Sequence, residues 1–244
     1  MRSGFGALYL KGRRLNSTID LAHYSRKDRR KIPVIINNFN RYSMLSGLID
    51  KLLEAELSNL IILDNNSTYL PLIDYYSVTP AKVVYLRRNI GYLALWESGF
   101  ISSIGNSPFI YTDPDVVPDD NCPIDFIDVL FESLICHPQL DKVGLALRLD
   151  DLPNSSPVTS DVIRHEQMYW QRRFSKNLYQ ASIDTTLALY RPGRCGGYWL
   201  NAGRTEWPYV ARHMPWYFDP ARLDNEETFY RSQVLTETYW SSSD

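Results

Sequence analysis

The chain has 244 residues, 44% hydrophobic content and a formal net charge of −2, so it can bury one large core, and we expect a single domain. The pI near 6.1 argues against a surface that neutralises many phosphates of a nucleic acid. The three cysteines show no C-x-x-C spacing, which suits a reducing compartment, and no apolar run is long enough to cross a bilayer. We therefore expect a cytoplasmic protein.

Residues 1–31 are predicted to be a basic N-terminal extension that precedes one domain over residues 32–244. The extension ends in a run of charge, Arg26, Lys27, Arg29, Arg30 and Lys31. A solvated lead-in is the favoured interpretation of such a run, and peripheral contact with an anionic membrane surface is the alternative.

From residue 32 onward, short apolar strands alternate with amphipathic helices. We expect strands over residues 32–37, 59–63, 82–86, 108–112, 142–148 and 178–190, and helices over 43–55, 69–76, 93–100, 124–136 and 161–174. This alternation is typical of a mostly parallel sheet that is covered on both faces. After residue 192 the periodicity is lost, aromatic residues concentrate up to residue 220, and the tail is polar.

Polar segments follow each of the first four strands. They are Asn37-Asn38-Phe39-Asn40-Arg41, Asp64-Asn65-Asn66-Ser67-Thr68, Arg87-Arg88-Asn89-Ile90-Gly91 and Asp113-Pro114-Asp115. Because ligands of open α/β sheets bind at the carboxyl ends of the strands, we expect the four loops to converge on one crevice. Two carboxylates one residue apart after a buried strand suit a hard divalent cation held against a phosphate.

The order of these four motifs resembles the nucleotide-sugar half of GT-A glycosyltransferases, especially family-2-like enzymes with an Asp-x-Asp motif. The resemblance implies a GT-A type, Rossmann-like α/β/α sandwich with a mostly parallel central sheet. Residues 32–120 would bind the nucleotide sugar and residues 121–240 the acceptor. The implied activity is metal-dependent transfer of a sugar from a UDP-, GDP- or dTDP-sugar to a hydroxyl of a glycan or lipid-linked acceptor, as in polysaccharide biosynthesis.

The resemblance also implies site residues, position by position. The residues expected to contact the nucleotide sugar are Asn37, Asn38, Arg41, Asp64, Arg88, Asn89 and Asp113. Mn²⁺ or Mg²⁺ would be held by Asp113, Asp115 and the late His213, with Arg212 as a possible clamp on the diphosphate. A divalent cation suits the reaction because it neutralises charge that grows on the leaving diphosphate. Pro114 departs from the commoner small or acidic middle residue but leaves both carboxylates available.

An inverting transfer needs a carboxylate base that deprotonates the acceptor hydroxyl. The family's usual Glu-Asp base motif is not recognisable here. Asp184 is the first candidate, because an acid in an apolar strand is costly unless it is used or paired. An ion pair with Arg191 or Arg194 is the structural alternative for Asp184, and Glu206 is the second candidate for the base. His165-Glu166 lacks the second His of a metalloprotease helix and is predicted to lie on the surface.

Two other classes of function compete with a transferase. A sugar-phosphate nucleotidyltransferase shares the sheet and an acidic metal site, but it carries a Gly-rich loop after the first strand where this chain has asparagines. A non-catalytic carbohydrate-binding module would use the aromatic segment but leaves the four polar loops unexplained. The sequence does not decide the sugar, the nucleobase, the acceptor or the stereochemical outcome.

Overall fold

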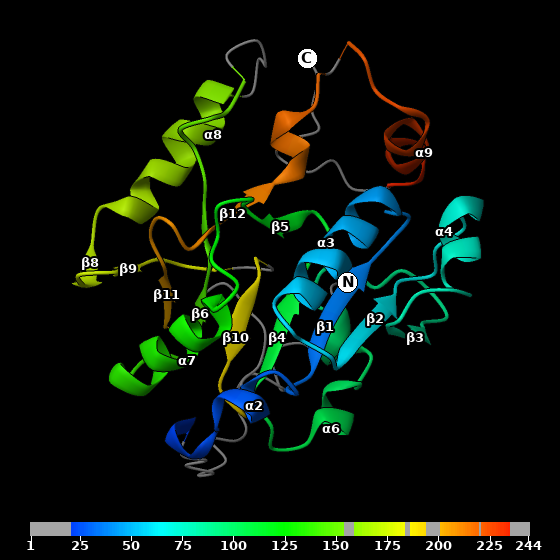
Figure 1. Ribbon diagram of the computed structural model, residues 1–244. Coiled ribbons are helices and arrows are strands. Elements are labelled where there is room, and N and C mark those ends of the chain that lie inside the picture. The colour runs from blue at the N-terminus through cyan, green and yellow to red at the C-terminus, as the bar shows by residue number, and fades with distance from the viewer. Residues whose placement is uncertain (1–20, 154–158, 184–185, 194–200, 220, 235–244) are drawn as a thin grey trace, which may run out of the picture.

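The computed structural model describes residues 21–153, 159–183, 186–193, 201–219 and 221–234 (Figure 1). Within these ranges the strands form a nine-stranded sheet in the order β3-β2-β1-β4-β10-β6-β11-β9-β8 and a three-stranded sheet in the order β5-β12-β7. The chain is therefore organised around one large central sheet and one small sheet.

The first half of the large sheet is parallel. Its strands are β1 (Val34–Asn38), β2 (Leu60–Asp64), β3 (Lys82–Tyr85) and β4 (Phe109–Thr112), and its helices are α3 (Ser43–Glu54), α4 (Leu70–Tyr75), α5 (Ala94–Glu97) and α6 (Ile101–Ile104). Strand β1 lies between β2 and β4, with Val34 opposite both Leu60 and Ile110. The carboxyl ends of β1, β2 and β4 consequently lie side by side.

Both faces of the sheet are covered. Val34 and Ile36 of β1 belong to the larger core cluster, which includes residues of α3 and of α7 (Phe126–Cys136). Ile35, between them, faces the opposite way and packs in a second cluster with residues of α5 and α6. Since successive side chains of a strand point to opposite faces, helices lie on both sides of the sheet. The predicted α/β fold with a mostly parallel, doubly covered central sheet is confirmed.

The second half of the sheet is mixed. Strand β10 (Ala188–Tyr190) runs antiparallel to both β4 and β6 (Lys142–Gly144), and β11 (Ala202–Arg204) is parallel to β6. The predicted strand over 142–148 is divided at Leu145, because its second part, β7 (Ala146–Leu147), belongs to the small sheet. Sequence periodicity of two cannot reveal where a strand leaves one sheet for another.

Two other predicted elements are also divided. The predicted helix over 161–174 ends earlier, as α8 (Thr159–Glu166) and the 3₁₀ turn η2 (Gln167–Trp170), and is followed by β8 (Arg173–Ser175). The predicted strand over 178–190 corresponds to β9 (Leu178–Gln180) and β10 within the described residues. Residues 184 and 185, including the candidate base Asp184, lie outside them.

The segment after residue 192 contains more regular structure than its sequence predicts. It holds β12 (Val210–His213), the 3₁₀ turn η3 (Met214–Tyr217) and helix α9 (Asn225–Gln233), and β12 pairs with β5 (Val116–Pro118) of the first half. The side chain of Asp224 accepts a hydrogen bond from the backbone N–H of Glu227, at 2.7 Å, and so caps α9.

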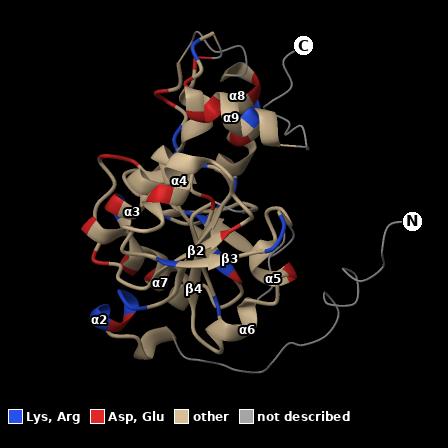
Figure 2. Cartoon of the chain, turned by 90° about the vertical axis from the view of Figure 1, so that its right-hand side faces the viewer, with Lys and Arg blue, Asp and Glu red and all other residues tan. Residues whose placement is uncertain are grey.

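The described part of the N-terminal extension, residues 21–31, packs against α7. It contains η1 (Leu21–His23) and α2 (Arg26–Arg29), and Leu21 is part of the main core. Arg29 and Arg30 contact Asp128 of α7 at 3.2 Å and 2.8 Å, and charged residues of both signs gather around α2 in Figure 2. The expectation of a solvated lead-in is therefore wrong for these arginines, because acids distant in sequence neutralise them.

Lys27 and Lys31 of the same run are exposed, so contact with an anionic surface stays a prediction. Among the helices in the described part of the chain, none combines the length and the apolar character that a membrane crossing requires.

Candidate functional site

The four polar loops meet at the carboxyl ends of the parallel strands. The Asn37 side-chain amide donates to Asp113 Oδ1, at 3.3 Å, and to the Gly91 carbonyl, at 3.4 Å. The Asn65 amide donates to Asn37 Oδ1, at 3.2 Å, and to the same carbonyl, at 3.0 Å, while Asn65 Oδ1 accepts from the Ile90 N–H. These bonds join all four loops, so the predicted convergence is confirmed. Asn65, which links three of the loops, was not among the predicted site residues.

Asn38 and Asp64 form a second, deeper layer. The Asn38 amide donates to the Tyr76 hydroxyl, at 2.9 Å, and that hydroxyl donates to Asp64 Oδ1, at 2.8 Å. The Ser67 N–H bonds to the other Asp64 oxygen, at 3.2 Å. Burial, reinforced by the charge of Asp64, raises the pKa of Tyr76 well above its usual value. Both predicted residues therefore hold the loops in place, and their contact with a nucleotide stays a prediction.

Arg88 and Asn89 lie on the exposed rim of the third loop. Asn89 Oδ1 accepts a hydrogen bond from the Gly91 N–H, at 2.9 Å, and Gly91 has a φ of +82°, a conformation that favours glycine. Arg88 is exposed, and its contact with a nucleotide stays a prediction.

Asp115 and His213 approach each other across the small sheet. His213 Nε2 lies 3.8 Å from Asp115 Oδ2, and the two side chains are half-buried. Pairing of β5 with β12 places His213 opposite Val116, and the Met214 N–H donates to the Asp115 carbonyl at 2.8 Å. His213 Nδ1 is buried without a hydrogen-bond partner in the described structure. Asp115 and the late histidine therefore lie near each other, and their role as ligands of a metal stays a prediction.

These residues fit a divalent cation as a pair. Carboxylate and imidazole are ligands that Mn²⁺ accepts, and two protein donors leave coordination positions for phosphate oxygens and water. Within the described ranges, no three His, Cys, Asp or Glu side chains are close enough to hold an ion among themselves. Asp113, the third predicted ligand, bonds to Asn37. A cation at Asp115 and His213 would therefore depend on oxygens supplied by a ligand.

Arg41 is held by helix α9, which the sequence analysis did not predict. Its guanidinium forms an ion pair with Glu227 and lies 3.4 Å from the centre of the Tyr230 ring. Burial raises the pKa of Tyr230; the charge of Arg41 opposes this, and the charges of Asp115 and Asp113 reinforce it. Helix α9 thus packs Tyr230 and Glu227 against Arg41 of the first loop.

Glu226 fixes the same helix to the start of α3. Its carboxylate accepts hydrogen bonds from the Tyr42 N–H, at 2.8 Å, and from the Ser43 hydroxyl, at 2.6 Å. An acid at a helix N-terminus is favourable because it meets unpaired N–H groups and the positive end of the helix dipole. Asp224 followed by Glu227 is a capping pattern in the sequence that could have revealed α9.

The remaining candidates of the second half are engaged with other side chains. Arg212 contacts Asp151 at 2.7 Å, Asp119 at 3.0 Å and Asp120 at 3.2 Å, which leaves little of its charge for a diphosphate. Glu206, the second candidate for the base, forms an ion pair with Arg173 at 2.8 Å. Neither contact was expected, because each joins segments far apart in the chain.

The surroundings of Asp184 are only partly described. Arg191, one of its two suggested partners, donates to the Leu140 carbonyl at 2.7 Å and to the Leu134 carbonyl at the end of α7. Arg194 lies outside the described residues. The surface prediction for Glu166 is wrong, because its carboxylate is buried and pairs with Arg204 at 2.6 Å.

No protein-family model and no curated protein match the chain. Among solved structures, it is similar to glucosyl-3-phosphoglycerate synthase from Mycobacterium tuberculosis in complex with Mn²⁺ and UDP-glucose, at 18% identity and a TM-score of 0.42, over 66% of this chain and 56% of that one. GalNAc-T7 with UDP, GalNAc and Mn²⁺ follows at 14% identity and a TM-score of 0.42, over 66% and 35%.

A cytidylyltransferase from Leptospira borgpetersenii is similar at 9% identity and a TM-score of 0.36, over 56% of this chain and 71% of that one. The chain spans little more than half the length of the mycobacterial synthase.

Proposed function

We propose that this protein is a metal-dependent glycosyltransferase that moves a sugar from a nucleoside-diphosphate donor to a hydroxyl group of a glycan or lipid-linked acceptor. The observation that carries the proposal is the hydrogen-bonded meeting of the four loops, with Asn37 bonded to Asp113 and Asn65 at the carboxyl edge of the sheet. The motif order of these loops is the one that resembles GT-A enzymes, and the edge is where open α/β sheets bind ligands.

In the proposed reaction, the first two loops position the nucleoside and the exposed Arg88 contributes positive charge near the diphosphate. Asp115 and His213 are the residues that would hold Mn²⁺ or Mg²⁺. Such a cation, when bound, offsets negative charge on the departing diphosphate. Asp113, already hydrogen-bonded to Asn37, would orient the ribose or a donor hydroxyl.

The acceptor hydroxyl must lose its proton as it attacks the anomeric carbon, and a carboxylate is the base we propose. Asp184 is retained as the first candidate on the sequence argument. Glu206 is the weaker candidate because its carboxylate already pairs with Arg173. When the acceptor hydroxyl, deprotonated by this carboxylate, attacks from the side opposite the departing nucleoside diphosphate, the anomeric centre is inverted.

The test is a donor screen. UDP-, GDP- and dTDP-sugars are incubated with the protein and mixed glycan acceptors, with and without Mn²⁺, and released nucleoside diphosphate is measured. We expect release with one nucleobase, at least about tenfold faster with Mn²⁺ than after chelation. Absence of release from every donor, together with no calorimetric binding of UDP, GDP or dTDP, would contradict the proposal.

The same assay distinguishes the competing classes. Release of pyrophosphate from a nucleoside triphosphate and a sugar phosphate would identify a nucleotidyltransferase. Sugar binding that is unaffected by the substitution Asp115→Ala, with no turnover of any donor, would identify a carbohydrate-binding module. NMR of the product's anomeric centre then decides between inversion and retention.

A further inference from the structure

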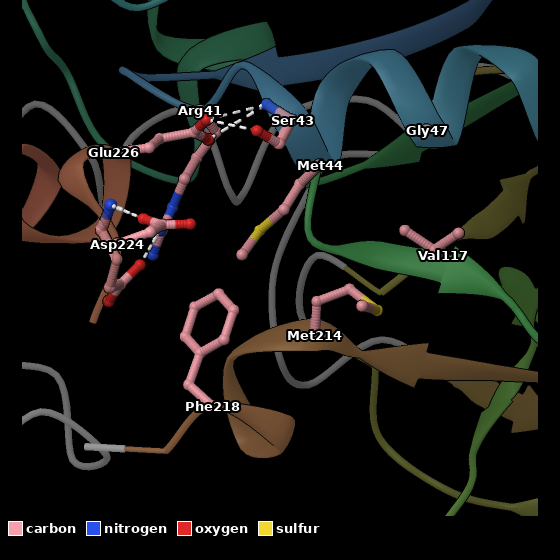
Figure 3. Close-up of a pocket in the computed structure, with 10 residues that line it drawn as sticks. Arg41, Ser43, Met44, Gly47, Val117, Met214, Phe218, Asp224 and Glu226 are labelled. Carbon is pink, nitrogen blue, oxygen red and sulfur yellow. Dashed lines mark hydrogen bonds and ion pairs between the residues drawn. The ribbon is translucent and has the colours of Figure 1, made fainter. Parts of the chain in front are cut away.

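A pocket of about 250 Å³ lies between α3, β5, η3 and α9 (Figure 3). Val117, two residues after Asp115 on β5, and Met214, directly after His213, both line it. Met44 and Gly47 of α3 and Phe218 after η3 complete its apolar lining. The pocket therefore adjoins the candidate cation site. Of its lining residues, only Arg41 was predicted from the sequence to have a role in the site.

The acidic residues at the pocket are already engaged within the protein. Glu226 bonds to the start of α3, Glu227 pairs with Arg41, and Asp224 caps α9. Of the lining side chains, Arg41 has a buried donor, Nε, without a hydrogen-bond partner in the described structure. The pocket thus presents a mainly apolar surface, and one buried donor without a partner belongs to a residue of its wall, which favours an apolar group that carries an oxygen atom.

Gly47 leaves part of this space open. It lies inside α3, where glycine costs about 1 kcal/mol relative to alanine. A Cβ atom built on Gly47 would meet no atom within 4 Å. The position therefore has room for a Cβ atom, and the glycine keeps the helix surface bare where a ligand would lie.

The size of the pocket limits its occupant. A dry apolar cavity of about 150 Å³ accommodates benzene. Sites for whole drug-sized ligands occupy about 300–1,000 Å³. A pocket of about 250 Å³ therefore suits one ring-sized apolar group of a larger molecule.

We propose that this pocket is an acceptor subsite that binds a ring-sized apolar group attached to the sugar or carrier that receives the transferred residue. An oxygen next to that group accepts a hydrogen bond from Arg41 Nε. The assignment to the acceptor rests on the proposed glycosyltransferase function. In that function the acceptor must lie close to the donor, and the pocket adjoins the residues that would hold the donor diphosphate. Binding of the apolar group itself is tested without turnover.

The test uses methyl NMR of the methionines. The chain has four, at positions 1, 44, 168 and 214, and two of them line the pocket. Protein labelled with ¹³C at the methionine methyls is titrated with phenyl β-glucoside, or with methyl β-glucoside, which lacks the ring, each to about 20 mM because a ring-sized group is expected to bind in the millimolar range.

We expect the Met44 and Met214 signals to shift with the phenyl compound and not with the methyl compound. Met168, which is 51% exposed on η2, serves as the internal reference. No shift, or an equal shift of Met168, would overturn the proposal.

A pocket-filling variant sharpens the result. Gly47→Leu is expected to abolish the shifts, whereas Ser46→Leu places the same side chain one residue earlier on α3, outside the lining, and is expected to preserve them. Shifts that persist in a folded Gly47→Leu protein would contradict the assignment of the pocket. If that variant does not fold, the wild-type titration decides alone.

Calorimetric titration with UDP, GDP and dTDP on the same samples separates this proposal from the previous one. Nucleotide binding without methionine shifts would contradict the proposed subsite and leave the proposed glycosyltransferase function in place. Methionine shifts without any nucleotide binding would show that the pocket binds an apolar group but would contradict its assignment to an acceptor.

Discussion

In the parallel half of the large sheet, side-chain amides join the polar loops to one another, although Arg41 of the first loop also pairs with Glu227 of α9, whereas in the mixed half buried ion pairs predominate. Asn37 and Asn65 link the loops of the parallel half at 3.2 Å. In the mixed half, Glu166 pairs with Arg204 at 2.6 Å, and Arg148 lies 3.0 Å from the fully buried side chain of Asp119, which follows β5. The charged side chains of the mixed half therefore pair mainly with one another.

This difference bears on where chemistry can take place. Neutral amides can exchange partners with a ligand at small cost, while breaking a buried ion pair leaves an uncompensated charge. The amide-linked loops are therefore suited to binding, and the paired charges to fixing the shape of the second half. Asp115 and His213 connect the two regions, because β5 of the first half pairs with β12 of the second.

The largest expected effect is a loss of turnover on substitution of Asp115, which together with His213 connects the two halves. Asp115→Ala should lower kcat about 10³-fold, because it removes one of two protein ligands of a cation that offsets charge on the leaving group. Steady-state release of nucleoside diphosphate is the measurement, with a thermal melt to show that the fold is retained. Asp120→Ala, which removes an exposed acid of the same segment, is the control and should keep turnover within about twofold. Equal losses in both variants would contradict the role of Asp115.

The second prediction concerns the base. Asp184→Asn should lower transfer by about 10²-fold, the lower end of the usual contribution of general base catalysis, while the Kd for the nucleoside diphosphate stays unchanged. Glu206→Gln is the matched control, and its transfer rate should remain close to that of the wild type because Glu206 is paired with Arg173. If Glu206→Gln lost transfer activity and Asp184→Asn kept it, Glu206 would be identified as the base.

The third prediction tests the ion pairs of the mixed half. Glu166→Ala should reduce the free energy of unfolding by about 3 kcal/mol, because it leaves Arg204 buried without its counter-charge. Urea denaturation measures the effect. Asp161→Ala, which removes the partner of the exposed Arg164, should cost less than about 1 kcal/mol. Similar losses would mean that burial does not set the strength of these pairs.

The smallest effect is a dependence of stability on pH. Burial alone would raise the pKa of Asp128, but Arg30 and Arg29 lower it below its usual value of 3.8. A depressed folded-state pKa contributes stability that is complete above the unfolded pKa, about 3.9, and is lost as pH falls through the folded pKa. The urea midpoint of the wild type should therefore fall below about pH 4.

Asp128→Asn is the matched variant for that measurement. It should be less stable at neutral pH and should lose less stability than the wild type on acidification, since it has no carboxylate to protonate at this position. Parallel pH profiles of the two proteins would show that Asp128 does not contribute to the acid transition.

Local sequence predicted the parallel half well, because each of its elements depends on nearby residues. The helix over 43–55 and the strand over 59–63 lie within about one residue of α3 and β2. Prediction was poorer after residue 136, where short strands change sheets and their partners are distant in sequence. The helix after Asp224 had a local capping signal, but its role in holding Arg41 depends on a contact between residues 41 and 227.

The sequence by itself determined the alternation of strands and helices and the four polar motifs, because apolar periodicity and turn chemistry are local properties. Only the tertiary structure decided which of these polar residues meet. It linked the loops through Asn65, brought His213 to Asp115, and enclosed Arg41 with α9. It also paired Arg212 and Glu206 with distant side chains, since such contacts depend on where strands pair and not on the residues beside them.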